Sequence, residues 1–172
     1  MRRILLSCAL LALLLLPAAA GASAFAKPGF LVVQKATGDG GSNGRPVITL
    51  VVKGFVLGRV SQEAQVDIFQ LPSANGQGAP SWKGADVSAT AIRWHGFTGK
   101  RLSASNFRFR AMGGSYRVVV RGSGVYLFAG GKGVVRLRGS SHYQNADGRY
   151  SVNGRPFRSL PARLLKRTFG GG

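Results

Sequence analysis

The stretch that decides the fold runs from Phe107 to Arg121 and reads FRFRAMGGSYRVVVR. On both sides of its central glycine pair, arginines alternate with aromatic or aliphatic residues. Because successive side chains of a β-strand point to opposite faces, this period of two places Phe107 and Phe109 on one face and Arg108 and Arg110 on the other. A Gly-Gly pair between two such runs is typical of a two-residue hairpin turn. The stretch therefore predicts an antiparallel hairpin with one buried face and one cationic face.

The same alternation recurs along the rest of the chain, where glycine-rich segments divide it into short pieces. The pair Gly130-Gly131 predicts a second hairpin. Asn153-Gly154 predicts a further turn, and Pro156 limits the segment that returns from it to a sheet edge. No segment carries an apolar stripe with helical spacing. The predicted strands are residues 30–34, 47–53, 55–60, 64–70, 88–94, 107–112, 116–121, 125–129, 133–138 and 149–152.

A weak internal repeat supports this all-β interpretation. Residues 51–54, VVKG, resemble residues 119–122, VVRG, and residues 66–68, VDI, resemble residues 135–137, VRL. Two related meanders packed face to face would bury both apolar faces, although valine-rich strands also resemble one another by chance. We predict a single antiparallel all-β domain of about ten short strands, arranged as a sandwich or as a barrel.

The N-terminus has the features of a secretory signal peptide. Arg2 and Arg3 precede an apolar run over residues 4–16, and small residues follow, with A-x-A cleavage sites after Ala24 and after Ala26. The apolar run is too short to span a bilayer comfortably. We expect this segment to be cleaved and the protein to be secreted or associated with the cell envelope.

The remaining chain divides into one domain and one tail. We expect residues 27–160 to form the basic β domain after a signal peptide over residues 1–26, and residues 161–172 to form a flexible basic tail. Residues 71–86 are rich in glycine, proline and serine and predict a long surface loop. The single cysteine, Cys8, lies in the signal segment, so the mature chain has no thiol for a disulfide, for catalysis or for metal binding.

The charge of the mature chain is strongly positive and unevenly distributed. Without Arg2 and Arg3 it carries 22 basic and five acidic residues, a net charge of +17. From Lys100 onward there are 15 basic residues and a single acid, Asp147. This asymmetry favours an anionic partner. A high net charge also keeps an exported protein soluble, and this alternative needs no partner.

Several motifs along the chain resemble a group of small exported actinobacterial proteins to which we can attach no activity. The resemblance implies export and a β fold, and it implies no catalytic residue, ligand or partner. It rests on turn glycines and strand residues: GAD at 84–86, IRW at 92–94, FRFR at 107–110, GG-x-YRV at 113–118, GSGV at 122–125, GVVRL at 133–137 and YSVNG at 150–154.

The inventory of reactive side chains is small. Ser140, Ser141, His142 and Asp147 supply the residue types of a hydrolase triad, but they lie in one polar loop without a nucleophile elbow. His95 and His142 lack metal-ligand spacing, and no phosphate-binding loop is present. We therefore expect no enzyme activity, no cofactor and no metal, and we keep a small hydrolase as a remote alternative.

The arginine pattern is the sharpest functional feature of the sequence. If Gly113-Gly114 forms a turn, Arg110 lies opposite Arg117, and such like charges repel unless solvent or an anion separates them. An arginine-studded sheet face binds phosphate, sulfate or carboxylate through paired hydrogen bonds. The aromatic residues alternate away from the arginines, which argues against a stacking surface for single-stranded nucleic acid. The candidate anion-binding residues are Arg108, Arg110, Arg117, Arg121, Arg136 and Arg138.

From this pattern we infer a non-enzymatic exported domain that associates with an anionic polymer of the envelope or its surroundings, or with anionic lipid headgroups. The alternative is a structural or protein-interaction module whose charge serves solubility alone. Salt-insensitive capture of an envelope protein would favour that module.

Overall fold

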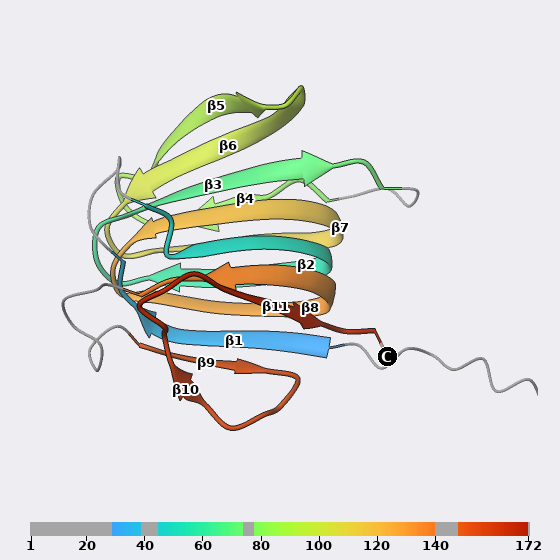
Figure 1. Cartoon of the computed structure of the whole chain (residues 1–172). Coiled ribbons are helices and arrows are strands. Elements are labelled where there is room, and N and C mark those ends of the chain that lie inside the picture. Colours follow the sequence, from blue (N-terminus) through green and yellow to red (C-terminus); the bar gives the residue numbers. More distant parts are fainter. Residues whose placement is uncertain (1–28, 39–44, 74–77, 140–147, 172) are drawn as a thin grey trace, which may run out of the picture.

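The structure, a computed structural model, describes residues 29–38, 45–73, 78–139 and 148–171 (Figure 1). These residues form strands and no helix, so the all-β prediction is confirmed, and none of their segments qualifies as a helical membrane span. The expected signal peptide, residues 1–26, lies outside the described residues. The strands are β1 (Gly29–Ala36), β2 (Ile48–Val60), β3 (Ala64–Leu71), β4 (Ser81–Lys83), β5 (Ser88–Trp94), β6 (Phe97–Ala104), β7 (Phe107–Gly122), β8 (Val125–Leu137), β9 (Arg149–Val152), β10 (Arg158–Ser159) and β11 (Leu165–Phe169).

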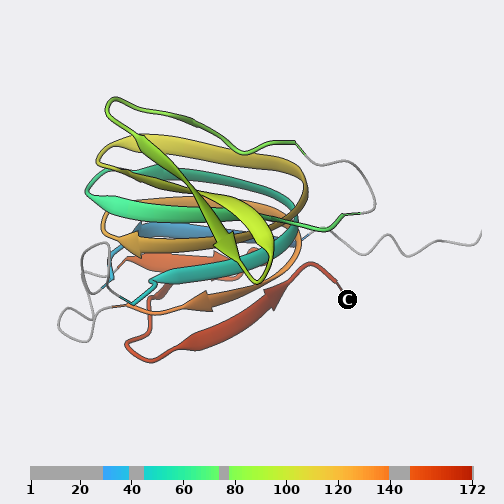
Figure 2. The same cartoon turned by 90° about the horizontal axis from the view of Figure 1, so that it is seen from above.

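All of these strands belong to one antiparallel sheet in the order β10-β9-β1-β8-β2-β7-β3-β6-β5, with β11 paired to β8 and β4 paired to β7. The end strands β10 and β5 do not meet, so the described sheet is not a closed barrel. Three long strands, β2, β7 and β8, lie side by side at its centre, and β2 pairs along its whole length with both neighbours. Figures 1 and 2 show these strands bending round at one end of the molecule, so that the sheet folds back over itself.

Glycines permit this bend. Gly54 of β2 lies in register with Gly114 of β7 and with Gly131 of β8. Its φ is +147°, and a Cβ atom on Gly54 would approach the carbonyl oxygen of Gly130 to 2.1 Å. Only a residue without a side chain combines this backbone conformation with such close contact between strands.

The bend divides the sheet into two layers. The first layer contains β1, β4 and β9 with residues 55–60, 107–112 and 125–130 of the long strands. The second layer contains β3, β5, β6 and β11 with residues 48–53, 115–122 and 132–137. Each layer therefore has an inner face toward the other layer and an outer face toward solvent.

The two predicted glycine hairpins are wrong. Gly113-Gly114 lies inside β7 and Gly130-Gly131 lies inside β8, and in each case the strand continues through the bend. A hairpin turn and a strand bend both use positive φ angles, as at Gly113 with +63°, so the local sequence does not distinguish them. The pairing distinguishes them, because β2 lies between β7 and β8 and pairs with both. The two halves of β7 therefore pair with β2 and not with each other, and the same holds for β8. The strands of the two sequence halves consequently interleave and do not form two separate meanders.

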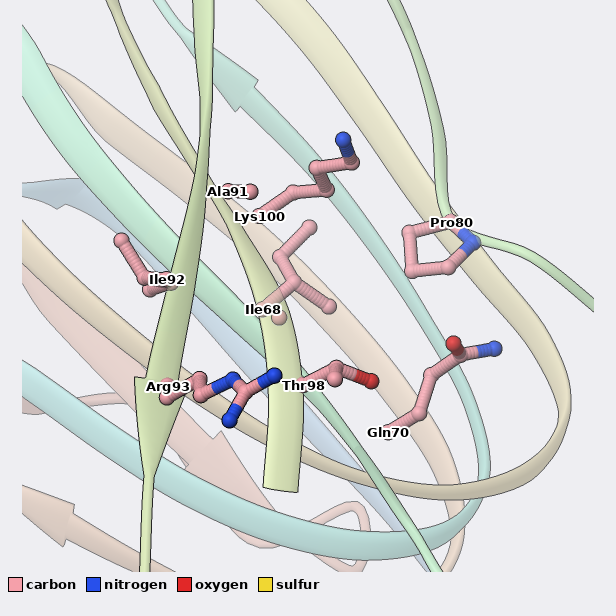
Figure 3. Close-up of a pocket in the computed structure, with 9 residues that line it drawn as sticks. Ile68, Gln70, Pro80, Ala91, Ile92, Arg93, Thr98 and Lys100 are labelled. Atoms are coloured by element: carbon pink, nitrogen blue, oxygen red, sulfur yellow. The ribbon is translucent and has the colours of Figure 1, made fainter. Parts of the chain in front are cut away.

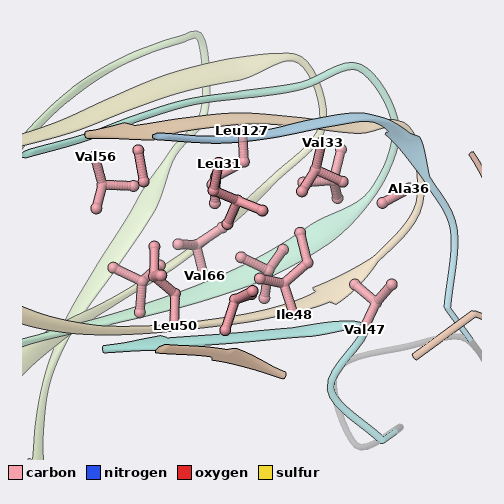
Figure 4. Packing of buried hydrophobic residues seen from close by; sticks show 14 of the residues in the cluster. Leu31, Val33, Ala36, Val47, Ile48, Leu50, Val56, Val66 and Leu127 are labelled. Carbon is pink, nitrogen blue, oxygen red and sulfur yellow. The ribbon is translucent and has the colours of Figure 1, made fainter. Parts of the chain in front are cut away.

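The inner faces bury a continuous apolar core between the layers (Figure 4). Leu31, Val33 and Leu127 reach it from the first layer, and Ile48 and Leu50 reach it from the second layer. The predicted alternation is confirmed in β7, where the phenylalanines of FRFR are buried and the arginines are exposed. Burial of each large aliphatic side chain contributes about 1.5–3 kcal/mol, so this core is the main source of stability.

The C-terminal part confirms one turn and corrects the expected tail. Asn153 and Gly154 both have positive φ and form the predicted turn, and β10 lies at the sheet edge as Pro156 requires. Residues 161–172 were expected to be flexible, but β11 pairs with β8, and Phe169 is buried in the core. Its ring occupies the space above Gly133, where a Cβ atom would come within 2.7 Å of it. Residues 165–169 pair with residues 133–137, about 30 positions earlier, and the sequence near residue 165 does not indicate this pairing.

Candidate anion-binding site

The predicted arginine face is divided between the two layers. Arg108 and Arg110 lie on the outer face of the first layer, and Arg117, Arg121 and Arg136 lie on the outer face of the second. Because residues 113–114 form a bend, the expected pair of Arg110 with Arg117 does not form.

The actual neighbours of these arginines are different. Arg110 is in register with Leu57 and Ser81, and Arg117 is in register with Val51 and Phe69. The sixth predicted residue, Arg138, follows β8, and its buried Nε has no hydrogen-bond partner among the described residues.

Asp67 organises the arginines of the second layer. It lies on β3, is almost fully buried, and accepts hydrogen bonds from Arg101 on β6 and Arg121 on β7. The Arg101 Nε and Nη2 atoms lie 2.8 and 3.1 Å from the two carboxylate oxygens, and Arg121 Nη1 lies 2.9 Å from Oδ2. The hydrogen bonds to Asp67 raise the pKa of Arg101. One carboxylate is thus shared by two arginines from flanking strands.

Arg117 is held mainly by aromatic rings. Its guanidinium carbon lies 4.2 Å from the ring centroid of Trp94 and 5.5 Å from that of Phe69. Burial lowers the pKa of Arg117; Asp67 opposes this effect, and repulsion from Arg121 and Arg136 adds to it. Stacking of this kind orients a guanidinium plane while leaving its N–H groups available to an acceptor.

We call Asp67, Arg101, Arg117, Arg121 and Arg136, together with the Trp94 ring, the Asp67 cluster. It contains four cations and one anion, and that anion is already bonded to Arg101 and Arg121. Such an excess of fixed positive charge matches a phosphate or carboxylate group, which accepts paired hydrogen bonds from guanidinium groups. Chemically, the cluster can bind and orient an oxyanion.

Comparison with models of known protein families, with curated proteins and with solved structures found no match. The resemblance to exported actinobacterial proteins stays a prediction.

Sequence reasoning missed Asp67, Arg101 and Trp94 as parts of this cluster. Asp67 lies on a predicted strand between the inward-facing residues Val66 and Ile68, and an acid on the outer face of a strongly basic sheet indicates pairing with arginine. Arg101 gave no such signal, because β6 contains too few apolar residues to be recognised as a strand. Trp94 reaches Arg117 only because β5 and β6 continue the sheet beyond β3.

Two hollows elsewhere also carry basic residues. A hollow of about 380 Å³ lies on the inner side of β5 and β6, and Figure 3 shows Ile68 between the side chains of Lys100 and Arg93. The two cations are separated by this apolar floor, so they do not converge on one anion. A second hollow of about 270 Å³ is lined by Arg155, Arg158 and Arg167 from the β9–β10 turn, β10 and β11. Its arginines converge only because β11 is a strand, which the sequence did not predict.

The described residues offer little for catalysis. They contain no group of three His, Cys, Asp or Glu side chains arranged to hold a metal ion. His95 lies in the β5–β6 turn with its ring edge-on to Trp94, at a centroid distance of 4.7 Å. The hydrolase candidates Ser140, Ser141, His142 and Asp147 lie outside the described residues, so that alternative stays a prediction.

Proposed function

We propose that the protein is a non-enzymatic exported β domain that binds phosphate- or carboxylate-bearing polymers of the cell envelope through the Asp67 cluster. The observation that carries this proposal is the placement of Arg117. It shares the outer face of the second layer with Arg121 and Arg136, Asp67 accepts hydrogen bonds from Arg101 and Arg121, and aromatic rings hold Arg117 in position. The aromatic rings and the attraction of Asp67 offset only part of the repulsion that Arg121 and Arg136 exert on Arg117, and a bound oxyanion would relieve more of it.

A repeating polyanion suits the cluster better than a small metabolite. Arg136 is exposed on β8 and Arg117 is half-buried on β7, with β2 between them, so acceptors can approach along the open face of the layer. Neighbouring strands lie about 4.8 Å apart, and Arg117 and Arg136 pair with positions 51 and 49 of β2, two residues apart, so their Cα atoms lie roughly 12 Å from each other. Two charged groups of one flexible chain, separated by a few repeats, can span this distance. Screening acts over about 8 Å at physiological ionic strength, so binding depends on direct contact and on salt.

The test is the binding of long-chain polyphosphate and of polygalacturonate to the purified protein over a salt series. The Arg117→Gln/Arg136→Gln variant should bind at least about tenfold more weakly, because each lost charged hydrogen bond contributes about 1.5–3 kcal/mol before screening. The matched control is Arg108→Gln/Arg110→Gln, which has the same net charge and an intact Asp67 cluster. Arg136→Gln alone changes an exposed side chain and separates loss of binding from loss of folding.

The outcomes are distinct. A loss confined to the cluster variants supports the proposal. Equal losses in both double variants would mean that net charge alone attracts the polymer, and undiminished binding would exclude the cluster. No binding of either polymer at low salt would favour an interaction module whose charge serves solubility.

A further inference from the structure

The outer face of the first layer carries a continuous apolar patch, formed by Phe30, Phe55, Leu57, Met112 and Phe128, which we call the aromatic patch. The Phe128 ring lies 5.5 Å from that of Phe55 and 6.4 Å from that of Phe30. Phe30, Leu57 and Phe128 are each 39% exposed and Met112 is 47% exposed. These side chains come from β1, β2, β7 and β8, so a rigid sheet holds them as one surface.

A basic border runs along this patch. Arg59 of β2 is in register with Arg108 of β7, which is in register with Lys83 of β4, and Arg110 is in register with Leu57. The Arg110 Nε donates a hydrogen bond of 2.9 Å to Ser81 Oγ, which orients its guanidinium group. All four cations of the border, Arg59, Lys83, Arg108 and Arg110, are exposed.

A shallow hollow lies where the patch meets the border. Its volume is about 480 Å³, and it is lined by the residues Leu57, Gly58, Trp82 and Phe109 together with Lys83, Arg108 and Arg110. A hollow lined by both apolar residues and cations accommodates a group that is charged at one end and apolar at the other. Lipid headgroups and the upper part of their acyl chains have this character.

Charge decides which occupant fits the face. None of the strands of the first layer, as far as the structure describes them, contains Asp or Glu. A second copy of the chain would bring the same basic border and be repelled, whereas an anionic bilayer supplies both an apolar layer and negative charge. Each Lys or Arg near such a surface contributes about 1 kcal/mol to attraction, and buried aromatic side chains add to it.

We propose that the aromatic patch and its basic border dock on the surface of an anionic lipid bilayer. The patch enters the boundary between headgroups and acyl chains, and the border contacts lipid phosphates. This face is separate from the Asp67 cluster, which lies on the other layer, so a protein docked through the first layer keeps the cluster open to a polymer. The inference therefore stands or fails independently of polymer binding.

The experiment is co-sedimentation of the purified protein with vesicles of equal parts phosphatidylcholine and phosphatidylglycerol, compared with vesicles of phosphatidylcholine alone. The Leu57→Ser/Phe128→Ser variant leaves the net charge unchanged. It should bind the mixed vesicles at least about tenfold more weakly, because two large apolar side chains no longer enter the bilayer surface when the protein docks. The matched control, Val51→Ser/Leu164→Ser, removes two exposed apolar side chains away from the patch and should bind normally.

A second pair of variants tests the border. Arg59→Gln/Arg108→Gln should weaken binding to the mixed vesicles, and Arg117→Gln/Arg136→Gln, with the same net charge, should not. No sedimentation with the mixed vesicles would overturn the proposal, as would equal losses in the patch variant and its control. Vesicle binding that survives both the patch and the border changes would overturn it as well. Binding of polyphosphate that depends on the patch, without any binding to vesicles, would assign this face to a soluble polyanion.

Discussion

Replacement of Gly54 by alanine tests whether the central bend depends on close contact between backbones. The new Cβ would lie 2.1 Å from the Gly130 carbonyl oxygen, a backbone atom that has no rotamer by which to move away. The φ of +147° adds about 1–3 kcal/mol of strain for a residue with a side chain. Displacing β8 to relieve the overlap costs about 1–3 kcal/mol more. We therefore expect a loss of about 4 kcal/mol in the free energy of unfolding, as the sum of these two effects.

The assay is urea denaturation followed by circular dichroism. With an m value of about 2 kcal/mol/M, the midpoint of the Gly54→Ala variant should fall by about 2 M. Gly113→Ala is the matched control in the same bend, because Gly113 has a φ of +63° but no heavy atom within 4 Å of an added Cβ. It should lose only about 1–2 kcal/mol, the usual cost of a left-handed conformation. Equal midpoints for the two variants would refute the argument from close approach.

Two further predictions concern the buried aromatic residues Tyr116 and Phe169. Tyr116 donates from its hydroxyl toward the carbonyl oxygens of Met112 and Gly78, each 2.7 Å away, and burial raises its pKa. The folded state therefore holds this proton more tightly than the unfolded chain, and its contribution to stability is complete below about pH 10 and lost as the pH rises through the folded-state pKa. Tyr116→Phe should remove this part of the alkaline loss in urea titrations at several pH values, and an unchanged profile would contradict it. Phe169→Ala should destabilise the protein by about 3–5 kcal/mol because its ring is buried against Gly133. A thermal melt unaffected by this change would show that β11 contributes nothing to the core.

Most of the inward and outward positions were predictable because strand alternation is a local property. The apolar side chains at 107, 109, 116, 118, 120, 135 and 137 are buried as the period of two predicts, whereas Val119 lies on the outer face and is buried nevertheless. The outer face of β3 is an exception. Asp67 and Phe69 point outward yet are buried, since Arg101, Arg121 and Trp94 pack over them from other strands. Alternation indicates which face a residue occupies, and the burial of that face depends on what else covers it.

In the candidate sites, too, the sequence indicates the face of each residue but not its neighbours on other strands. The arginines on alternate positions of β7 and β8 were found from the sequence, but their grouping was not. Whether Arg110 lies near Arg117 depends on whether residues 113–114 form a turn or a bend, and both conformations use glycine. The aromatic patch could not be predicted from the sequence, because Phe30, Phe55 and Phe128 lie far apart in the chain, on β1, β2 and β8.

The sequence by itself determined the β class, the strand faces, the positions where the backbone reverses or bends, and the large excess of positive charge. These properties depend on side-chain alternation and on the conformational freedom of glycine, which act over a few residues. The tertiary structure alone decided that β2 lies between β7 and β8, that β11 joins the core, and that the arginines divide between two outer faces. The physical reason is that strand pairing is made by backbone hydrogen bonds common to all residues, so the choice of partner is settled by packing of the whole sheet and not by any one segment.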